Sequence, residues 1–169
     1  MDLFLFIIGS LLLVAGVVAS FMPFRWTAAI VWLGLYLSHL SKMIYIPRSQ
    51  LLFWAAAAIL TVGINTLLPR DISRRQHGLA YIAAGSIAGI FIAIMLSGDK
   101  IIPGSIVGAI IGAIAYSRTP QGRFLRFPST VFINHLAAKG LPTVVAQSIA
   151  GIALASYIAQ HLILSSINQ

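Results

Sequence analysis

Six apolar stretches, each about 20 residues long, follow one another along the whole chain. A helix of about 20 apolar residues, rising about 1.5 Å per residue, is long enough to cross the roughly 30 Å hydrocarbon core of a bilayer. Repeated stretches of this length are typical of polytopic membrane proteins. The sequence therefore predicts an all-α transmembrane helical bundle of about six spans, at residues 3–22, 26–46, 50–68, 79–97, 101–117 and 141–164.

Composition excludes a soluble fold. Charged residues make up 8% of the 169 residues and hydrophobic ones 59%, whereas a soluble domain carries about 25% charged residues. This chain has too few polar groups to cover a soluble surface, so a single integral membrane domain is expected over residues 1–169. Asp2 stands where a signal peptide has positive charge, and no small-residue cleavage site follows, so the first stretch is expected to be a retained span.

The distribution of basic residues predicts the orientation. The chain has eleven Lys and Arg residues and three Asp and Glu residues. In membrane proteins such an excess of basic residues is found mainly in the cytoplasmic loops. The side predicted to be cytoplasmic receives eight basic residues and the other side receives three. Both termini should therefore lie outside the cytoplasm. The basic residues sit in short loops between spans, so nucleic acid is not an expected partner. The cytoplasmic eight are Arg25, Arg70, Arg74, Arg75, Arg118, Arg123, Arg126 and Lys139; the other three are Lys42, Arg48 and Lys100.

The first two spans leave one alternative open. Only residues 23–25 separate them, so they must form an antiparallel hairpin. This hairpin either crosses the bilayer or forms a re-entrant pair that dips in without crossing. The orientation of the later spans is the same in both cases.

Glycines at four-residue spacing mark the fourth and fifth spans. Residues four apart share one helix face, and glycines there let another backbone approach closely. Because residues 98–100 make a short turn, we expect the two spans to pack as a glycine zipper within one chain. Pore lining is the second interpretation of these stripes. The last span carries a further small-residue stripe that includes Gly151, and one of the stripes could be left over for contact with a second copy of the chain. The zipper glycines are Gly85, Gly89, Gly104, Gly108 and Gly112.

The longest polar interval, residues 118–140, predicts a short cytoplasmic interfacial helix. Ser129 is a suitable N-cap, Gly140 a suitable end, and Pro142 should stop the helix before the last span. We favour an ordinary amphipathic connector over a dedicated lipid- or partner-binding element. The basic residues expected to contact anionic lipid or phosphate are Arg118, Arg123, Arg126 and Lys139.

Residues that carry chemistry are scarce. The three acids, Asp2, Asp71 and Asp99, all lie at span ends, where they cannot form a proton relay through the bilayer. The chain has no cysteine, and its four histidines, at positions 39, 77, 135 and 161, lack metal-ligand spacing. Ser86 stands in a Gly-Ser-Ile-Ala-Gly segment that departs from a nucleophile elbow. We expect no catalytic residues, metal or cofactor, and interhelical hydrogen bonds from Asn65 and Gln147.

The segment from residue 73 to 117 resembles a bacterial family of small multi-pass membrane proteins catalogued as domain of unknown function 456. In that family a Ser-Arg step leads into a Gly-rich helix and then a Pro-Gly helix with glycines every four residues. Ser117 departs from it, since an acid is frequent there, as does the first turn at residues 23–25. The resemblance implies a fold and a membrane location but no mechanism. It rests on Ser73, Arg74, Gly85, Gly89, Pro103, Gly104, Gly108, Gly112 and Ala113.

The expected function is non-enzymatic. We predict a structural, accessory or lipid-interacting protein of a bacterial inner membrane, with membrane lipids, a second copy or another membrane protein as partners. The alternative is a small oligomeric channel or transporter for an unidentified solute. A third class, an enzyme acting on lipids, would use the cytoplasmic arginines to hold a phosphate headgroup, but no base or nucleophile accompanies them.

Overall fold

The computed structural model describes residues 1–22, 24, 26–67, 78–96, 100–123, 125 and 128–167, with backbone only at residue 67 and from residue 161 on. Every regular element in this part of the chain is helical, which confirms the all-α prediction. The elements are α1 (Asp2–Ala19), α2 (Thr27–Leu40), α3 (Arg48–Leu67), α5 (Leu79–Leu96), α6 (Ile101–Ser117), η1 (Pro120–Gly122), α7 (Thr130–His135), η2 (Leu136–Gly140) and α8 (Leu141–Ile167).

Four helices are long and apolar enough to cross a membrane: α1, α3, α5 and the continuous helix that spans Thr130–Gln160. The protein is therefore a membrane protein by the length and composition of its helices. Two further apolar helices are shorter, α2 with 14 residues and α6 with 17. At about 1.5 Å per residue, α2 measures about 21 Å. The count of six spans, and the choice between a crossing and a re-entrant first hairpin, remain predictions.

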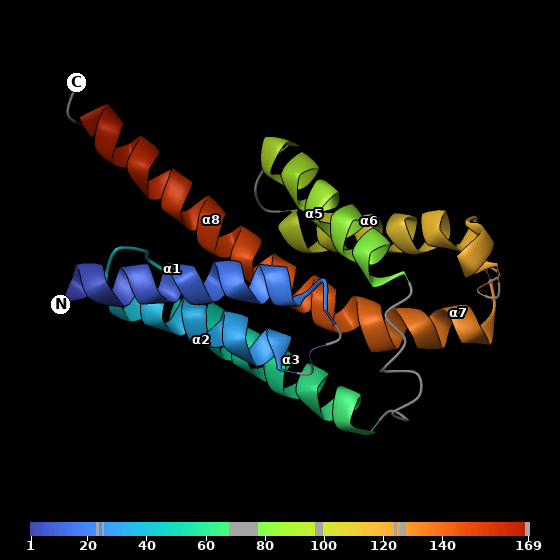
Figure 1. Cartoon of the computed structure of the whole chain (residues 1–169). Coiled ribbons are helices and arrows are strands. Elements are labelled where there is room, and N and C mark those ends of the chain that lie inside the picture. Colours follow the sequence, from blue (N-terminus) through green and yellow to red (C-terminus); the bar gives the residue numbers. More distant parts are fainter. Residues whose placement is uncertain are drawn as a thin grey trace.

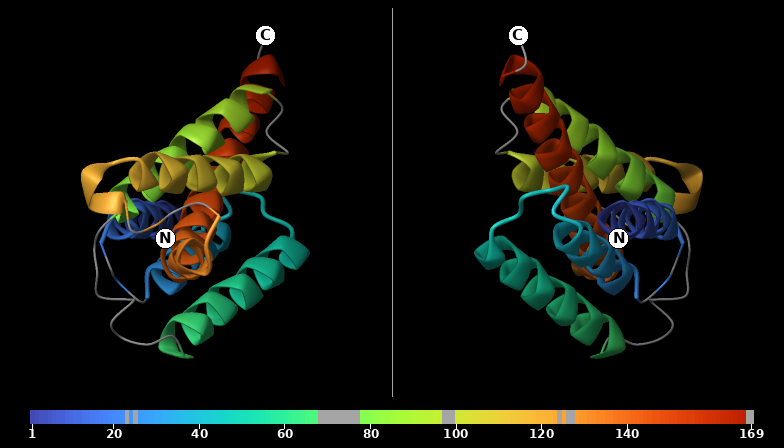
Figure 2. Two further views of the ribbon diagram at one scale, coloured as in Figure 1. Left: turned by 90° about the vertical axis from the view of Figure 1, so that its right-hand side faces the viewer. Right: turned by 90° about the vertical axis from the view of Figure 1, so that its left-hand side faces the viewer.

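Two antiparallel hairpins flank one long helix. The α1–α2 hairpin and the α5–α6 hairpin lie on opposite sides of α8, and both chain ends lie at the same end of the bundle (Figures 1 and 2). The first hairpin turns at the end opposite the termini, and the second turns at the end where the termini lie (Figure 1). The central helix, α8, packs against each of α1, α2, α3, α5 and α6.

Two apolar clusters hold this arrangement together. The larger one joins α2, α3 and α8 through buried Leu35, Trp54 and Ile149. The smaller one joins α5, α6 and α7 through Ile82, Tyr116 and Phe132. The helix that runs from α7 into α8 contributes to both clusters, so it couples the two hairpins.

The second helix ends earlier than predicted, at Leu40 instead of residue 46. Serine hydroxyls at its end bond to the helix backbone: the Ser41 hydroxyl donates to the Ser38 carbonyl at 2.6 Å. Lys42 then adopts a left-handed backbone conformation, with φ of 56°, which takes the chain out of the helix. Ile44 and Ile46, which extend the apolar stretch in the sequence, are buried in the following non-helical segment.

The predicted separation between the interfacial helix and the last span was wrong. Ser129 does cap α7, since its hydroxyl accepts from the Phe132 N–H at 3.1 Å, but the helix does not end at Gly140. A π-helical turn, η2, joins α7 to α8, and the Leu141 N–H donates to the Leu136 carbonyl five residues back. This wider turn accommodates the Pro142 ring, which in a regular α-helix would clash with the carbonyl four residues earlier.

Candidate functional site: a polar cavity and an apolar groove along α8

Four polar residues, which we call the polar stripe, face the interior along the α7–α8 helix. They are His135, Lys139, Thr143 and Gln147, spaced four residues apart, and their exposed fractions are 7%, 4%, 2% and 2%. Residues at this spacing share one helix face. Burying polar and charged groups costs free energy unless other groups satisfy them, so a line of four in the most central helix is the clearest chemical feature of the described chain.

The stripe contacts α6 at its His135 end and the end of α1 at its Gln147 end. The His135 ring stacks on the Tyr116 ring of α6, with centroids 6.5 Å apart. The Thr143 hydroxyl donates to the Lys139 carbonyl at 2.8 Å, and the Gln147 amide nitrogen donates to the Ser20 hydroxyl at 3.0 Å. Two buried atoms of the stripe, His135 Nε2 and Gln147 Oε1, have no hydrogen-bond partner among the described residues. Such atoms commonly meet water or a ligand.

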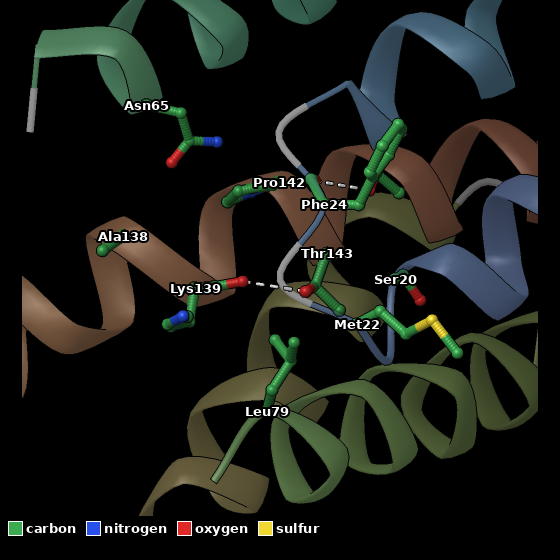
Figure 3. Close-up of a pocket in the computed structure, with 10 residues that line it drawn as sticks. Ser20, Met22, Phe24, Asn65, Leu79, Ala138, Lys139, Pro142 and Thr143 are labelled. Carbon is green, nitrogen blue, oxygen red and sulfur yellow. Dashed lines mark hydrogen bonds between the residues drawn. The ribbon is translucent and has the colours of Figure 1, made fainter. Parts of the chain in front are cut away.

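A small cavity, which we call the polar cavity, opens beside Lys139 and Thr143 (Figure 3). Its volume is about 30 Å³, which is room for two or three water molecules at about 10–15 Å³ each. It lies where α1 and α3 end and where α2 and α5 begin. Ten residues line it: Ser20, Met22, Phe24, Thr27, Asn65, Leu79, Ala138, Lys139, Pro142 and Thr143.

The local sequence explains how Lys139 comes to lie in this cavity. Lys139 is part of the π-helical turn, which places it on the buried side of the helix. Asn65 approaches from α3 and is itself only 6% exposed; in Figure 3 its amide extends toward the α8 segment that carries Lys139 and Pro142. π-helical turns occur often at functional sites, so the combination of this turn, a buried lysine and a cavity identifies the candidate site.

A second hollow, which we call the apolar groove, runs along another face of the same helix. It has a volume of about 430 Å³, within the range of about 300–1,000 Å³ typical of ligand pockets. Its walls come from α3, α6 and the helix from α7 to α8, with Trp54, Ile106 and Val144 as examples from each. Of the described residues that line it, Ser148 alone carries a hydroxyl, and within the described part of the chain this buried oxygen has no hydrogen-bond partner.

The structure brings the predicted zipper glycines together. A Cβ added to Gly85 or Gly89 would overlap the carbonyl oxygen of Gly108 or Gly104, and one added to Gly112 would overlap the Tyr81 carbonyl. Backbones therefore meet directly between α5 and α6. The Ser86 and Ser105 hydroxyls share a 2.7 Å hydrogen bond in the same contact. Gly151 lies elsewhere, on α8, where a Cβ would meet Ile90 and Ile101.

Three of the four predicted lipid-contact residues lie in the described part of the chain, and they differ in exposure. Arg118 and Arg123 are exposed, Lys139 is buried in the polar cavity, and Arg126 lies outside the described residues. Sequence reasoning missed the polar stripe as a unit. The four-residue spacing of the stripe is visible in the sequence. Because Gly140 and Pro142 were expected to end one helix before the next began, the four residues were not assigned to a single helix face.

In the described ranges, no three His, Cys, Asp or Glu side chains gather closely enough to hold a metal ion. His39 is partly buried, with no hydrogen-bond partner at Nδ1. His77, Asp71 and Asp99 lie outside the described residues, as does the side chain of His161.

Comparison with family models, with curated proteins and with solved structures found no match for this chain. The resemblance to domain of unknown function 456 therefore stays a prediction.

Proposed function

We propose that this protein is a non-enzymatic, lipid-interacting membrane protein that holds a phospholipid of the cytoplasmic leaflet in the apolar groove. The groove itself is the observation that carries the proposal. Its volume of about 430 Å³ and its almost wholly apolar lining suit an acyl chain, which offers no hydrogen bonds. Because the surrounding bilayer is also apolar, an acyl chain in the groove is held by van der Waals packing against the groove walls.

Charge favours an anionic headgroup at one end of the groove. Ile133 and Leu136 line the groove at the α7 end, and the same end of the bundle carries the exposed Arg118 and Arg123. Arginine binds phosphate oxygens with paired hydrogen bonds. An anionic phospholipid therefore combines the two chemistries found there, an apolar chain and a phosphate group.

The proposal extends to location and assembly. We place the protein in a bacterial inner membrane with six spans, and on that topology the eight-to-three distribution of basic residues favours both termini outside the cytoplasm. A structural or accessory role in the cell envelope, as a homo-oligomer or with another membrane protein, fits a chain whose helices offer packing surfaces.

Native mass spectrometry tests the groove. Protein released from nanodiscs of phosphatidylglycerol and phosphatidylcholine should retain phosphatidylglycerol. Ile106→Trp fills the groove and should reduce the retained lipid severalfold. Ile111→Trp is the matched control, because Ile111 is exposed on the same helix and does not line the groove. Equal lipid retention by the two variants would contradict the proposal.

The polar stripe favours a second candidate, a small oligomeric channel or transporter for an unidentified solute. Buried polar residues within a membrane domain often mark a solute or ion path, and Gln147 Oε1 and His135 Nε2 have no partner. Flux assays in proteoliposomes, with Gln147→Leu as the control variant, examine this candidate. Flux no higher than in empty vesicles would exclude it.

A further inference from the structure

A third hollow, which we call the α1 groove, lies between α1 and α8. Its volume is about 520 Å³, within the range of about 300–1,000 Å³ typical of ligand pockets. We propose that the α1 groove binds the acyl chain of a second phospholipid, whose ethanolamine headgroup lies between Lys42 and Asp2. The two grooves share no lining residue, so this inference does not depend on the function proposed for the apolar groove.

One face of α1 forms a wall of the α1 groove along most of the helix. Phe6, Ser10, Val14 and Val18 all line the groove, and residues spaced four apart share one helix face. From Phe6 to Val18 the helix rises about 18 Å, which is close to the depth of one leaflet in a hydrocarbon core roughly 30 Å thick. This length suits an acyl chain of one leaflet, whereas a partner helix that crosses the bilayer needs a surface along its full thickness.

One end of the α1 groove lies at the end of the bundle where both termini lie. There α8 diverges from α1 (Figures 1 and 2). The Phe6 and Tyr157 rings stack between the two helices, with centroids 5.6 Å apart, and Ile44 lines the groove beside them. Aromatic rings are frequent where the hydrocarbon core meets the lipid headgroups. On the topology proposed above, this end faces the outer leaflet, so the headgroup should lie there.

An acidic side chain lies at this end of the groove. Asp2 precedes Phe6 by four residues and so continues the groove-lining face of α1 by one helical turn. Asp2 is exposed, and it is the only acid in the described part of the chain. A carboxylate accepts charge-assisted hydrogen bonds from an ammonium group. The position and the charge of Asp2 therefore fit a headgroup that carries a primary amine.

Lys42 brings a positive charge to the same end. It is exposed and precedes Ile44, which lines the groove, by two residues, or at most about 7 Å between Cα atoms. In the amide orientation that satisfies both of its polar groups, Gln160 of α8 donates to the Met43 carbonyl at 2.6 Å and accepts from the Tyr45 N–H at 2.9 Å. These bonds hold the segment around Lys42 against α8. The Lys42 ammonium is thereby kept near the groove, where it can donate to a phosphate oxygen.

The packing of the first hairpin brings the acid and the base to one end. A Cβ added to Gly9 of α1 would overlap Ser38 of α2. Asp2 lies seven residues before Gly9, and Lys42 lies four residues after Ser38. Because α1 and α2 are antiparallel, both charges lie beyond this contact on the same side of it. One base and one acid match the phosphate and the ammonium of an ethanolamine headgroup. In phosphatidylcholine the methyl groups on the nitrogen leave no hydrogen-bond donor, and phosphatidylglycerol has no cation.

Native mass spectrometry tests the occupant of the α1 groove. Protein is released from nanodiscs that contain equal amounts of phosphatidylethanolamine, phosphatidylcholine and phosphatidylglycerol. Val14→Trp fills the groove, and because Val14 is exposed the substitution leaves the core intact. Leu11→Trp is the matched control, since Leu11 is exposed on the same helix and does not line the groove. Val14→Trp should retain severalfold less phosphatidylethanolamine than Leu11→Trp.

Charge variants test the headgroup. Lys42→Asn removes the positive charge and places asparagine, which tolerates a left-handed backbone, where φ is 56°. It should lower the retained phosphatidylethanolamine by about fivefold. Asp2→Asn removes the carboxylate with little change in size, and it should lower the preference for phosphatidylethanolamine over phosphatidylcholine by a similar factor. Lys100→Gln is the control, because Lys100 is an exposed basic residue of the second hairpin, and it should behave like the wild type.

Equal retention of phosphatidylethanolamine by Val14→Trp and Leu11→Trp would overturn the proposal, as would equal retention of phosphatidylethanolamine and phosphatidylcholine by the wild type. A changed oligomeric state of Val14→Trp with unchanged lipid would assign the groove to a second copy of the chain and would also overturn it. Ile106→Trp fills the apolar groove and should leave the retention of phosphatidylethanolamine unchanged, just as Val14→Trp should leave that of phosphatidylglycerol. Failure of one groove proposal is thereby distinguishable from failure of the other.

Discussion

The Gln147 side-chain amide donates a 3.0 Å hydrogen bond to the Ser20 hydroxyl, and the two residues are 127 positions apart in the sequence. This contact joins the central helix, α8, one helical turn after Thr143, to Ser20 at the end of α1, which itself lines the polar cavity. Both side chains are buried. The stripe on α8 is therefore tied to the first hairpin by a specific polar interaction in addition to apolar packing.

Ser20→Ala should lower the free energy of unfolding by about 1–2 kcal/mol, because it leaves the buried Gln147 amide nitrogen without a partner while Oε1 already lacks one. Adding Gln147→Leu should recover most of that loss, since an apolar pair of similar shape needs no hydrogen bond. Unfolding by SDS in mixed micelles measures both changes. A double variant no more stable than Ser20→Ala would contradict the interpretation.

Replacing two helical glycines by alanine distinguishes the effect of close packing between helices from the effect of helix propensity alone. A Cβ at Gly108 would overlap the Gly85 carbonyl oxygen, whereas nothing lies within 4 Å of a Cβ at Gly63. Gly108→Ala should therefore destabilise the protein by about 1–3 kcal/mol through overpacking. Gly63→Ala should stabilise it by about 0.5 kcal/mol by reducing the freedom of the unfolded chain. Thermal unfolding in one detergent compares them; equal shifts would refute close packing at Gly108.

Local sequence signals predicted individual elements well. The apolar run at residues 101–117 matches the bounds of α6, and Ser129 caps α7 as expected. The end of α2 was missed because Ile44 and Ile46 continue the apolar stretch. A hydropathy pattern averages over several residues, so it does not predict the left-handed backbone conformation of Lys42 that ends the helix.

The candidate site was harder to predict because it depends on tertiary contacts. Ser20, Asn65 and Lys139 come from three helices far apart in the sequence, and no local pattern brings them together. The stripe on α8 was visible as a spacing, but Pro142 normally ends a helix. Only the π-helical turn before Pro142 lets the helix continue and aligns Lys139 with Thr143 and Gln147.

Two buried serines should respond in opposite ways to replacement by alanine. The Ser86 hydroxyl shares a 2.7 Å hydrogen bond with Ser105, so Ser86→Ala should cost about 1 kcal/mol of unfolding free energy. The Ser148 hydroxyl is buried without a partner, so Ser148→Ala should stabilise the protein by about 1 kcal/mol. Chemical unfolding in mixed micelles gives the two values. A loss of stability in Ser148→Ala would show that its hydroxyl has a partner in the membrane.

Cysteine labelling tests both the orientation and the first hairpin, because the chain has no cysteine of its own. Tyr45, in the connection between α2 and α3, and Gln121, in η1 after α6, are both exposed, and these two segments lie at opposite ends of the bundle (Figure 1). In intact cells a membrane-impermeant maleimide should label Tyr45→Cys and should reach Gln121→Cys only after lysis. The reverse labelling pattern would contradict the predicted orientation.

Met22, in the exposed turn between α1 and α2, distinguishes a first hairpin that crosses the bilayer from a re-entrant one. If the first hairpin crosses the bilayer, the maleimide should label Met22→Cys only after lysis, as it does Gln121→Cys. If Met22→Cys is not labelled either before or after lysis, the hairpin is a re-entrant pair.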